Sequence, residues 1–501
     1  MEAFISSFMT GAGLLFGDPL AIALFFAGLF GGMLFGAIPG INMLTLGAVL
    51  LPFTAMMSAP HAIMLYSVLY CSGVFGGAIT AILFNIPGSP ENAPTAFDGY
   101  PMSLKGEAGK AIGAAVICSA LGGAISVLIM MAATPIIAVW AIRNFGQPEI
   151  FALICFGLAV SASVGAKDIW RGLLSVSLGL SVALVGTDPV DGVPRFTFGS
   201  MFMLAGIHFI PVVLGLFAVA EVLSKGSEKL QAGSAGGKYS VTFPSIREFW
   251  AEKITVARSV VIGFFAGLLP GIGATLASFL SYGEAVRWGG KKKKFGTGEM
   301  QGVIASETAN NSATGAAMIP LLALGLPGGA LTAMMMGVFQ LHGMQPGPGI
   351  LRGQHDLVWL VFVAMFFANV CILALGYIQT KTVVHLLKIP FHLLAPVILA
   401  ISTIGAFAVR NQILDVWVMF IAGIIGFFLR KTGYSIAGVV LGVILGSIGE
   451  SSFAVSMQML DYSFVALLQR PIAAFLIAGA VLTILVSMYS ALRRAGRGVE
   501  A

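Results

Sequence analysis

The chain has 501 residues, of which 58% are hydrophobic and 10% charged, with a mean hydropathy of +0.96. Soluble domains are roughly half apolar and about a quarter charged, so this composition excludes a soluble globular protein. Apolar runs of about 17 to 25 residues, the length that a helix needs to cross a bilayer, recur along nearly the whole chain. We therefore expect an all-α polytopic membrane protein with about 11 or 12 membrane-spanning segments.

The net charge of +6 comes from basic residues in short loops between apolar runs. Basic loops set the orientation of a membrane protein, so we expect no nucleic-acid partner. The four cysteines form no CxxC pair and the six histidines are scattered singly, which indicates neither a disulfide framework nor a metal or other cofactor. The acidic Glu2 is unlike the basic start of a cleaved signal peptide, so we expect the N-terminus to be retained.

The apolar runs fall on either side of one long polar segment. The runs before it lie at 3–17, 18–38, 43–57, 62–84, 111–142, 149–164, 172–186 and 199–223. The unbroken runs late in the chain lie at 356–380, 391–408, 413–429, 434–451 and 471–491. The polar segment is basic with a Gly/Ser-rich middle, which is typical of a cytoplasmic linker. We therefore predict a first transmembrane repeat at 1–223, a linker at 224–254 and a second repeat at 255–501.

A helix-breaking motif occurs twice, 231 residues apart. The stretch GMLFGAIPGIN at 32–42 matches GFFAGLLPGIG at 263–273, with both Gly, the Pro-Gly-Ile and the gaps preserved. A second break repeats at an offset of 240, from Pro87-Gly88 to Pro327-Gly328. One Pro-Gly is often only a packing kink, but repetition at fixed spacing favours a functional role. The predicted helix breaks are Pro39, Pro87, Pro270 and Pro327.

The second copy of the motif has basic residues on both sides. Only 28 residues separate Arg258 from Arg287. Two full crossings need about 17 residues or more each, so we predict a re-entrant hairpin that enters from the cytoplasm. Backbone at such a turn must line a cavity or be buried in protein.

Loop charges predict the orientation of the two halves. Counting crossings outward from the linker places Lys105 and Lys110 inside and the loop 343–355 outside, so the halves are inverted. Arg430, Lys431 and the basic C-terminus then lie on the cytoplasmic side. Inverted halves with broken helices favour a solute site near the midplane with alternating access.

Helices that begin at such breaks present unpaired N–H groups, equivalent to roughly half a positive charge, and suit an anion. The motif regions contain no Lys or Arg, so the anion would depend on helix ends, amides, hydroxyls and a co-bound cation. The predicted site residues are Gly40, Ile41, Asn42, Thr45, Asn85, Gly88, Ser89, Gly271, Gly273, Thr275, Ser278, Asn310, Asn311, Ser312 and Gly328.

Glu307 is the acid beside the second hairpin. One interpretation makes it the carrier of a coupling proton, because acids at membrane depth are commonly functional. The other, which we favour, places it at the cytoplasmic surface near Lys294. Asn310 and Asn311 have an alternative role as well, in capping a helix or joining helices by hydrogen bonds.

An enzyme and a channel are the two competing classes of function. An intramembrane hydrolase would need a nucleophile and a base, but no GxSxG, HExxH or GxGD pattern occurs, so we expect no enzyme. An anion channel or exporter pore is the alternative to a coupled transporter. Paired closed hairpins suit occlusion of a solute better than a continuous pore.

Four motifs resemble the large membrane subunit of bacterial tripartite tricarboxylate transporters, the TctA type. They are GAIPGIN at 36–42, the segment 85–101 with IPGSP, GLLPGIG at 267–273 and ETANN at 307–311. The resemblance implies an inner-membrane permease that takes up a carboxylate such as citrate, driven by a Na+ or H+ gradient. It also implies two partners, a small membrane subunit and a periplasmic solute-binding protein that delivers the substrate.

Overall fold

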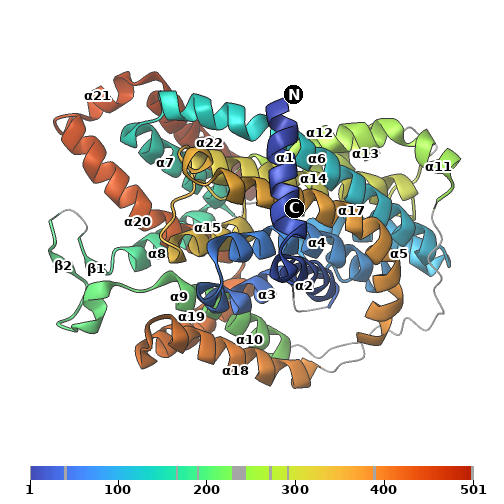
Figure 1. Ribbon diagram of the computed structural model, residues 1–501, viewed down its shortest axis with the longest axis horizontal. Coiled ribbons are helices and arrows are strands. Elements are labelled where there is room, and N and C mark those ends of the chain that lie inside the picture. Colours follow the sequence, from blue (N-terminus) through green and yellow to red (C-terminus); the bar gives the residue numbers. More distant parts are fainter. Residues whose placement is uncertain are drawn as a thin grey trace.

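The computed structural model describes residues 2–38, 42–164, 168–188, 191–227, 244–269, 273–289, 293–386 and 391–497, and this part of the chain is almost entirely helical (Figure 1). Its one pair of strands is the short antiparallel ribbon of β1 (Gly186–Thr187) and β2 (Pro194–Arg195). The helices up to residue 227 are α1 (Glu2–Phe16), α2 (Pro19–Gly36), α3 (Met43–Leu50), η1 (Leu51–Met56), α4 (Ala59–Phe84), η2 (Pro90–Asn92), α5 (Ala93–Leu104), α6 (Ala108–Asn144), α7 (Gln147–Val164), α8 (Ile169–Ala183), η3 (Phe202–Ala205), α9 (Phe209–Leu214), η4 (Gly215–Val219) and α10 (Ala220–Ser227). Those from residue 246 onward are α11 (Ile246–Ala251), α12 (Lys253–Gly267), α13 (Gly273–Trp288), α14 (Met300–Ile319), η5 (Pro320–Leu324), α15 (Ala330–Leu341), α16 (Ile350–Gly353), α17 (His355–Leu386), α18 (Phe391–Arg410), α19 (Ile413–Thr432), α20 (Ile436–Met459), α21 (Phe464–Gln469) and α22 (Pro471–Arg497).

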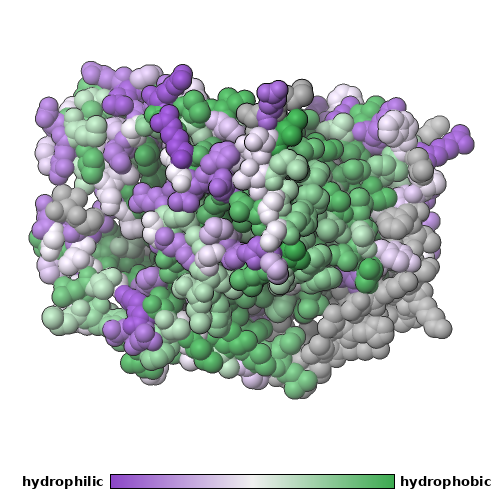
Figure 2. Space-filling model, viewed as in Figure 1, coloured by the Kyte–Doolittle hydropathy of each residue, from purple (hydrophilic) through white to green (hydrophobic). Residues whose placement is uncertain are grey.

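Nine of the described helices are long and apolar enough to cross a membrane, and five more are apolar but shorter. Figure 2 shows hydrophobic residues covering a broad continuous area of one face of the molecule, as expected of a surface in contact with lipid. The prediction of an all-α polytopic membrane protein is therefore confirmed. The inversion of the two halves stays a prediction.

The two Pro-Gly breaks at the offset of 240 have the same backbone design. Asn85 follows α4 and Gly325 follows η5, and both adopt the left-handed conformation, with φ of 56° and 74°. The next N–H groups bond back into the helix, from Ile86 to the Thr80 carbonyl at 3.4 Å and from Leu326 to the Pro320 carbonyl at 3.0 Å. Each helix thus stops at the same point of the repeat, directly before its Pro-Gly.

Small residues let the helices of each half pack closely. A Cβ added at Gly36 of α2 would lie 2.4 Å from the Gly73 carbonyl oxygen of α4. In the second half a Cβ at Gly267 of α12 would lie 2.6 Å from the Ala313 carbonyl oxygen of α14. Both glycines belong to the repeated motif, so the repeat preserves the backbone contact between helices.

Helices α12 and α13 form an antiparallel hairpin. The Ser281 hydroxyl donates to the Ser259 hydroxyl at 2.8 Å, and Gly273 lies against Gly267 at the other end. The arms have 15 and 16 residues, each short of the about 17 that a crossing requires. These lengths fit the predicted re-entrant hairpin, whose turn at 270–272 lies outside the described residues.

Candidate functional site

Four helices begin around one cavity of about 420 Å3. The helices are α3, α13, α15 and α20, and their first residues form part of the cavity wall. The N-terminus of a helix carries unpaired N–H groups and about half a positive charge. Four such ends around one space make an environment that favours an anion.

The cavity wall repeats with the sequence. Positions 42–44 line it and so do 273–275, their equivalents at the offset of 231. Positions 90 and 91 line it and so do 330 and 331, at the offset of 240. Segments that lie more than 200 residues apart in the chain therefore meet around one space, as the repeated motif predicts.

The four helix starts differ in how their first N–H groups are satisfied. The Asn42 side-chain oxygen accepts from the backbone N–H groups of Leu44 and Thr45, both at 3.0 Å, and so caps α3. The Ser435 hydroxyl caps α20 through the N–H of Gly438 at 3.0 Å. Helix α13 begins at Gly273, the equivalent of Asn42, and a glycine has no side chain that could accept such bonds. The residue before Gly273 lies outside the described part of the chain.

Several predicted site residues lie in this wall and others lie behind it. Those in the wall are Asn42, Gly273, Thr275 and Gly328. Those that do not line the cavity are Thr45, Asn85, Gly88, Ser89, Ser278, Asn310, Asn311 and Ser312, together with the breaks Pro87 and Pro327. Pro39, Gly40, Ile41, Pro270 and Gly271 lie outside the described residues.

Residues behind the wall support it. The Thr45 hydroxyl donates to the Asn42 side-chain oxygen at 3.3 Å, and the Ser278 hydroxyl bonds to the Thr275 carbonyl at 2.8 Å. Asn310 donates to the backbone carbonyl of Glu91 at 3.4 Å, a bond between α14 and η2. The alternative role of Asn310, a hydrogen bond between helices, is therefore confirmed.

Five polar residues of the wall are not among the predicted site residues: Tyr70, Glu91, Arg430, Tyr434 and Ser435. Arg430 was interpreted only as a basic residue at the end of an apolar run, and the expected absence of a basic side chain at the site is wrong. Because α19 packs against α10, Arg430 lies beside the cavity and forms an ion pair with Glu221. The signal in the sequence that could have indicated this ion pair is the position of Glu221 and Arg430, each near the end of an apolar run.

Glu307 is completely buried, so its predicted position at the cytoplasmic surface is wrong. Helix α14 is covered by α5, α6, α12 and α13. The Glu307 carboxylate accepts from the side chains of Asn310 at 3.2 Å, Asn92 at 3.3 Å and Ser119 at 3.0 Å, and also from Thr95. Its hydrogen bonds thereby connect the two halves of the chain behind the residues that line the cavity.

Comparison with known proteins assigns the chain to a family. A model described as "Tripartite tricarboxylate transporter TctA family" matches residues 22–441. The chain belongs to this family. It is therefore a membrane component of a transporter and not an enzyme.

Two relatives of this TctA-family chain come from Agrobacterium vitis. An uncharacterized 52.8 kDa protein in the TAR-I ttuC' 3' region is 34% identical over 475 residues, which cover 95% of this chain and 94% of the relative. An uncharacterized protein in the TAR-II ttuC' 3' region is 32% identical over 231 residues, which cover 46% of this chain and 96% of the relative. No solved structure matches.

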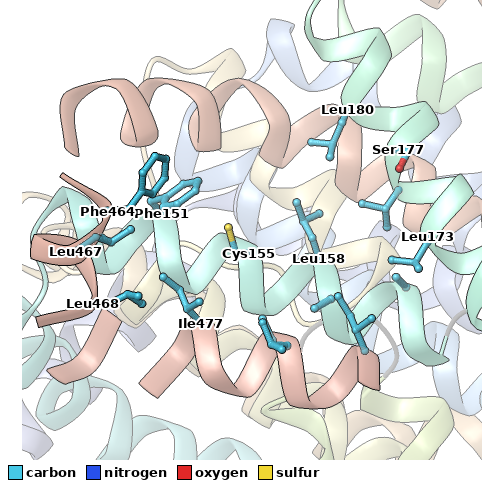
Figure 3. Close-up of a pocket in the computed structure, with 16 residues that line it drawn as sticks. Phe151, Cys155, Leu158, Leu173, Ser177, Leu180, Phe464, Leu467, Leu468 and Ile477 are labelled. Atoms are coloured by element: carbon cyan, nitrogen blue, oxygen red, sulfur yellow. The ribbon is translucent and has the colours of Figure 1, made fainter. Parts of the chain in front are cut away.

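A second cavity of about 560 Å3 lies among α7, α8, α21 and α22 (Figure 3). The labelled side chains are almost all aliphatic or aromatic, with Cys155 and Ser177 as the exceptions. None of the described residues that line it is charged. An apolar space of this kind does not suit a carboxylate, so the cavity at the helix starts is the candidate solute site of this TctA-family protein.

Proposed function

We propose that this protein takes up a tricarboxylate or related carboxylate by secondary transport coupled to Na+ or H+. The observation that carries the proposal is the convergence of four helix N-termini on one cavity that both halves of the chain build. The N-terminus of a helix supplies positive potential and N–H donors without a lysine or arginine, so it can hold an anion. The family match supports a transported carboxylate.

The size and charge of the cavity suit a small, multiply charged acid. The volume of about 420 Å3 falls within the range of about 300–1,000 Å3 that is typical of small-molecule sites. Arg430 is already paired with Glu221, which leaves the four helix N-termini as the main electropositive groups. Hydroxyls such as that of Thr275 would supply further hydrogen bonds.

We further propose that the protein lies in the bacterial inner membrane with its C-terminus in the cytoplasm. The basic residues of the linker and of the C-terminus support this orientation. The partners would be a small membrane subunit and a periplasmic solute-binding protein, as the word tripartite in the family description suggests. Movement of one half against the other would expose the cavity to each side in turn.

Uptake of labelled citrate into proteoliposomes with both partners present tests this function. We expect saturable uptake under a Na+ gradient alone or a proton gradient alone, and none without a gradient. Uptake with neither gradient, or a leak that does not saturate, would instead favour the channel. Citrate is only the first probe, and other small carboxylates would follow in competition.

Variants test the position of the site. Thr275→Val removes a hydroxyl from the cavity wall and should raise KM, whereas Thr483→Val makes the same change on α22, away from the cavity, and should not. Bulky replacement of Gly40 or Gly271 should abolish uptake while membrane insertion stays normal. Normal uptake by both glycine variants would contradict the proposed site.

A further inference from the structure

The cavity proposed for an anion has a carboxylic acid in its own wall. Glu91 belongs to η2, the short helix that follows the Pro87-Gly88 break, and only 6% of its surface is exposed. It lines the cavity together with Thr275 and Tyr70. The hydroxyls of Ser89 and Thr275 are its polar neighbours.

No basic side chain neutralises Glu91. The elements packed against η2 are α4, α5, α13 and α14. Their titratable groups nearest to it are Tyr70, which lines the cavity, and Glu307, which is bonded to Asn92, and neither is basic. Asp98 of α5 is turned instead to the loop 296–299. Within the described part of the chain, no ion pair includes Glu91. Arg430 shares the cavity but is paired with Glu221.

Glu91 and a bound anion therefore conflict. Two negative charges repel strongly in a confined site of low dielectric constant, and a buried carboxylate without a cationic partner is itself unfavourable. An anion site that contains such a group works only when a cation neutralises the carboxylate. The cation can be a proton on the carboxyl oxygen or a metal ion beside it.

The repeat argues that this acid is not required for packing. Leu331 is the equivalent of Glu91 at the offset of 240 and lines the same cavity from the other half. The fold thus accommodates an apolar side chain at this position of the repeat. Glu307 differs, because four side-chain donors surround it and it does not line the cavity.

We propose that Glu91 binds the coupling cation, a proton or a sodium ion, together with the carboxylate substrate. This inference rests on the proposed function. The cation neutralises the Glu91 carboxylate when the anion enters, so that one positive charge crosses with each substrate molecule by this route. Release of the cation on the other side restores the negative charge, which repels the anion and promotes its release.

The test separates movement of substrate from coupling to the ion. The complete transporter with both partners is reconstituted, and two rates are measured with labelled citrate: exchange with internal citrate in the absence of ion gradients, and accumulation under a Na+ or a proton gradient. Glu91→Gln mimics the neutralised acid. We expect it to keep exchange and to lose accumulation down to the level without a gradient. The gradient that drives the wild type identifies the cation.

Matched variants define the alternatives. Glu284→Gln makes the same change on α13 outside the cavity wall and should behave as wild type, while Glu91→Asp keeps a carboxylate and should keep accumulation, at a lower rate. Accumulation by Glu91→Gln at the wild-type level would overturn the inference. So would loss of exchange together with accumulation in a normally inserted Glu91→Gln protein, or uncoupling by Glu307→Gln instead. If the wild type exchanged neither citrate nor any of the other small carboxylates, the proposed function would be overturned, and this inference with it.

Discussion

The two Pro-Gly breaks at 87 and 327 share one backbone design but carry different side chains. After the first break the chain presents Glu91 and Asp98, and at the equivalent positions after the second it presents Leu331 and Val338. Both segments line the cavity and both follow a helix that ends in a left-handed residue. The comparison teaches that the repeat preserves the scaffold of the site, whereas the chemistry lies in the positions where the halves differ.

The motif at 32–42 and its copy show the same division. Asn42 caps α3 with its side chain, whereas the equivalent Gly273 has no side chain that could do so at the start of α13. Leu44 corresponds to Thr275, and both line the cavity. The helix start of the first half thus carries a capping asparagine and an apolar residue, and that of the second half carries a glycine and a hydroxyl. This difference would orient an asymmetric solute.

The largest expected effect comes from the glycines that hold the two breaks in place. A Cβ at Gly88 would lie 2.0 Å from the backbone oxygen of Gly36, whereas a Cβ at Gly328 would lie 2.8 Å from the Ala317 side chain. Overpacking typically costs about 1–3 kcal/mol. We expect Gly88→Ala to exceed that range and Gly328→Ala to stay within it, measured as the free energy of unfolding in detergent. Equal losses would show that the two breaks are packed alike.

Removal of the Asp98 carboxylate should have the next largest effect. It is buried and accepts from the N–H groups of Gly296 at 2.8 Å, of Gly298 at 2.9 Å and of Glu299 at 2.9 Å, and from the Tyr282 hydroxyl at 2.9 Å. Asp98→Ala leaves these donors without their acceptor, so we expect a loss of about 3 kcal/mol. Hydrogen exchange should become faster at 296–299.

The control for this variant is Val338→Ala, at the equivalent position of the second half. It removes apolar contacts of a buried side chain and so lowers stability, but it should leave exchange at 296–299 unchanged. Faster exchange there in both variants would mean that general destabilisation, and not loss of the acceptor, releases the loop.

Loss of the α3 cap should have a smaller effect. Asn42→Ala removes the acceptor for two N–H groups and should cost about 1 kcal/mol, whereas Asn42→Gly should cost only a few tenths. The glycine variant also gives the first half the residue type that the second half has at the equivalent position, Gly273. We expect its KM for citrate to change while its Tm stays close to that of the wild type. A large fall in Tm with glycine would contradict the comparison with Gly273.

The smallest effect is expected at an exposed ion pair away from both breaks. A hydrogen bond from Lys110, followed by bonds from Ser245, lowers the pKa of Glu248 from 4.5 to about 2. Because the folded-state pKa is lowered, the pair contributes stability above about pH 4.5 and loses it as the pH falls toward 2. Glu248→Gln should lower Tm slightly at neutral pH, and the difference should vanish near pH 2. A difference in Tm between the two proteins that grew as the pH fell would contradict the lowered pKa of Glu248 in the folded protein.

The sequence predicts the breaks well because their causes are local. Proline and glycine restrict the backbone wherever they stand, so the ends of α4 and η5 follow from Pro87 and Pro327 without knowledge of the packing. Repetition at fixed spacing then indicates which segments meet, and Asn42 and Thr275 do line one cavity. This much of the fold and of the candidate site is encoded along the chain.

The remaining wall residues could not be predicted because they depend on how distant helices pack. Arg430 and Tyr434 reach the cavity because α19 packs against η4 and α10, and because α20 packs against α15. Glu307 was placed at the surface from its nearness in sequence to Lys294, but the partners that satisfy it lie on η2, α5 and α6. Whether a polar helix of a membrane protein lies at the surface or is buried is therefore better predicted from the polar residues elsewhere in the chain that could pair with it.

The composition of α14 has a consequence for biogenesis. Its buried face carries Glu307, Asn310 and Asn311, and it is not among the described helices that are apolar enough to enter a bilayer unaided. A charged residue at the centre of a helix costs about 2.5–3.5 kcal/mol during insertion by the translocon. The donors that offset this cost, Asn92 and Ser119 among them, are synthesised earlier. Because these donors precede α14 in the chain, they are available to pair with Glu307 as soon as α14 leaves the ribosome.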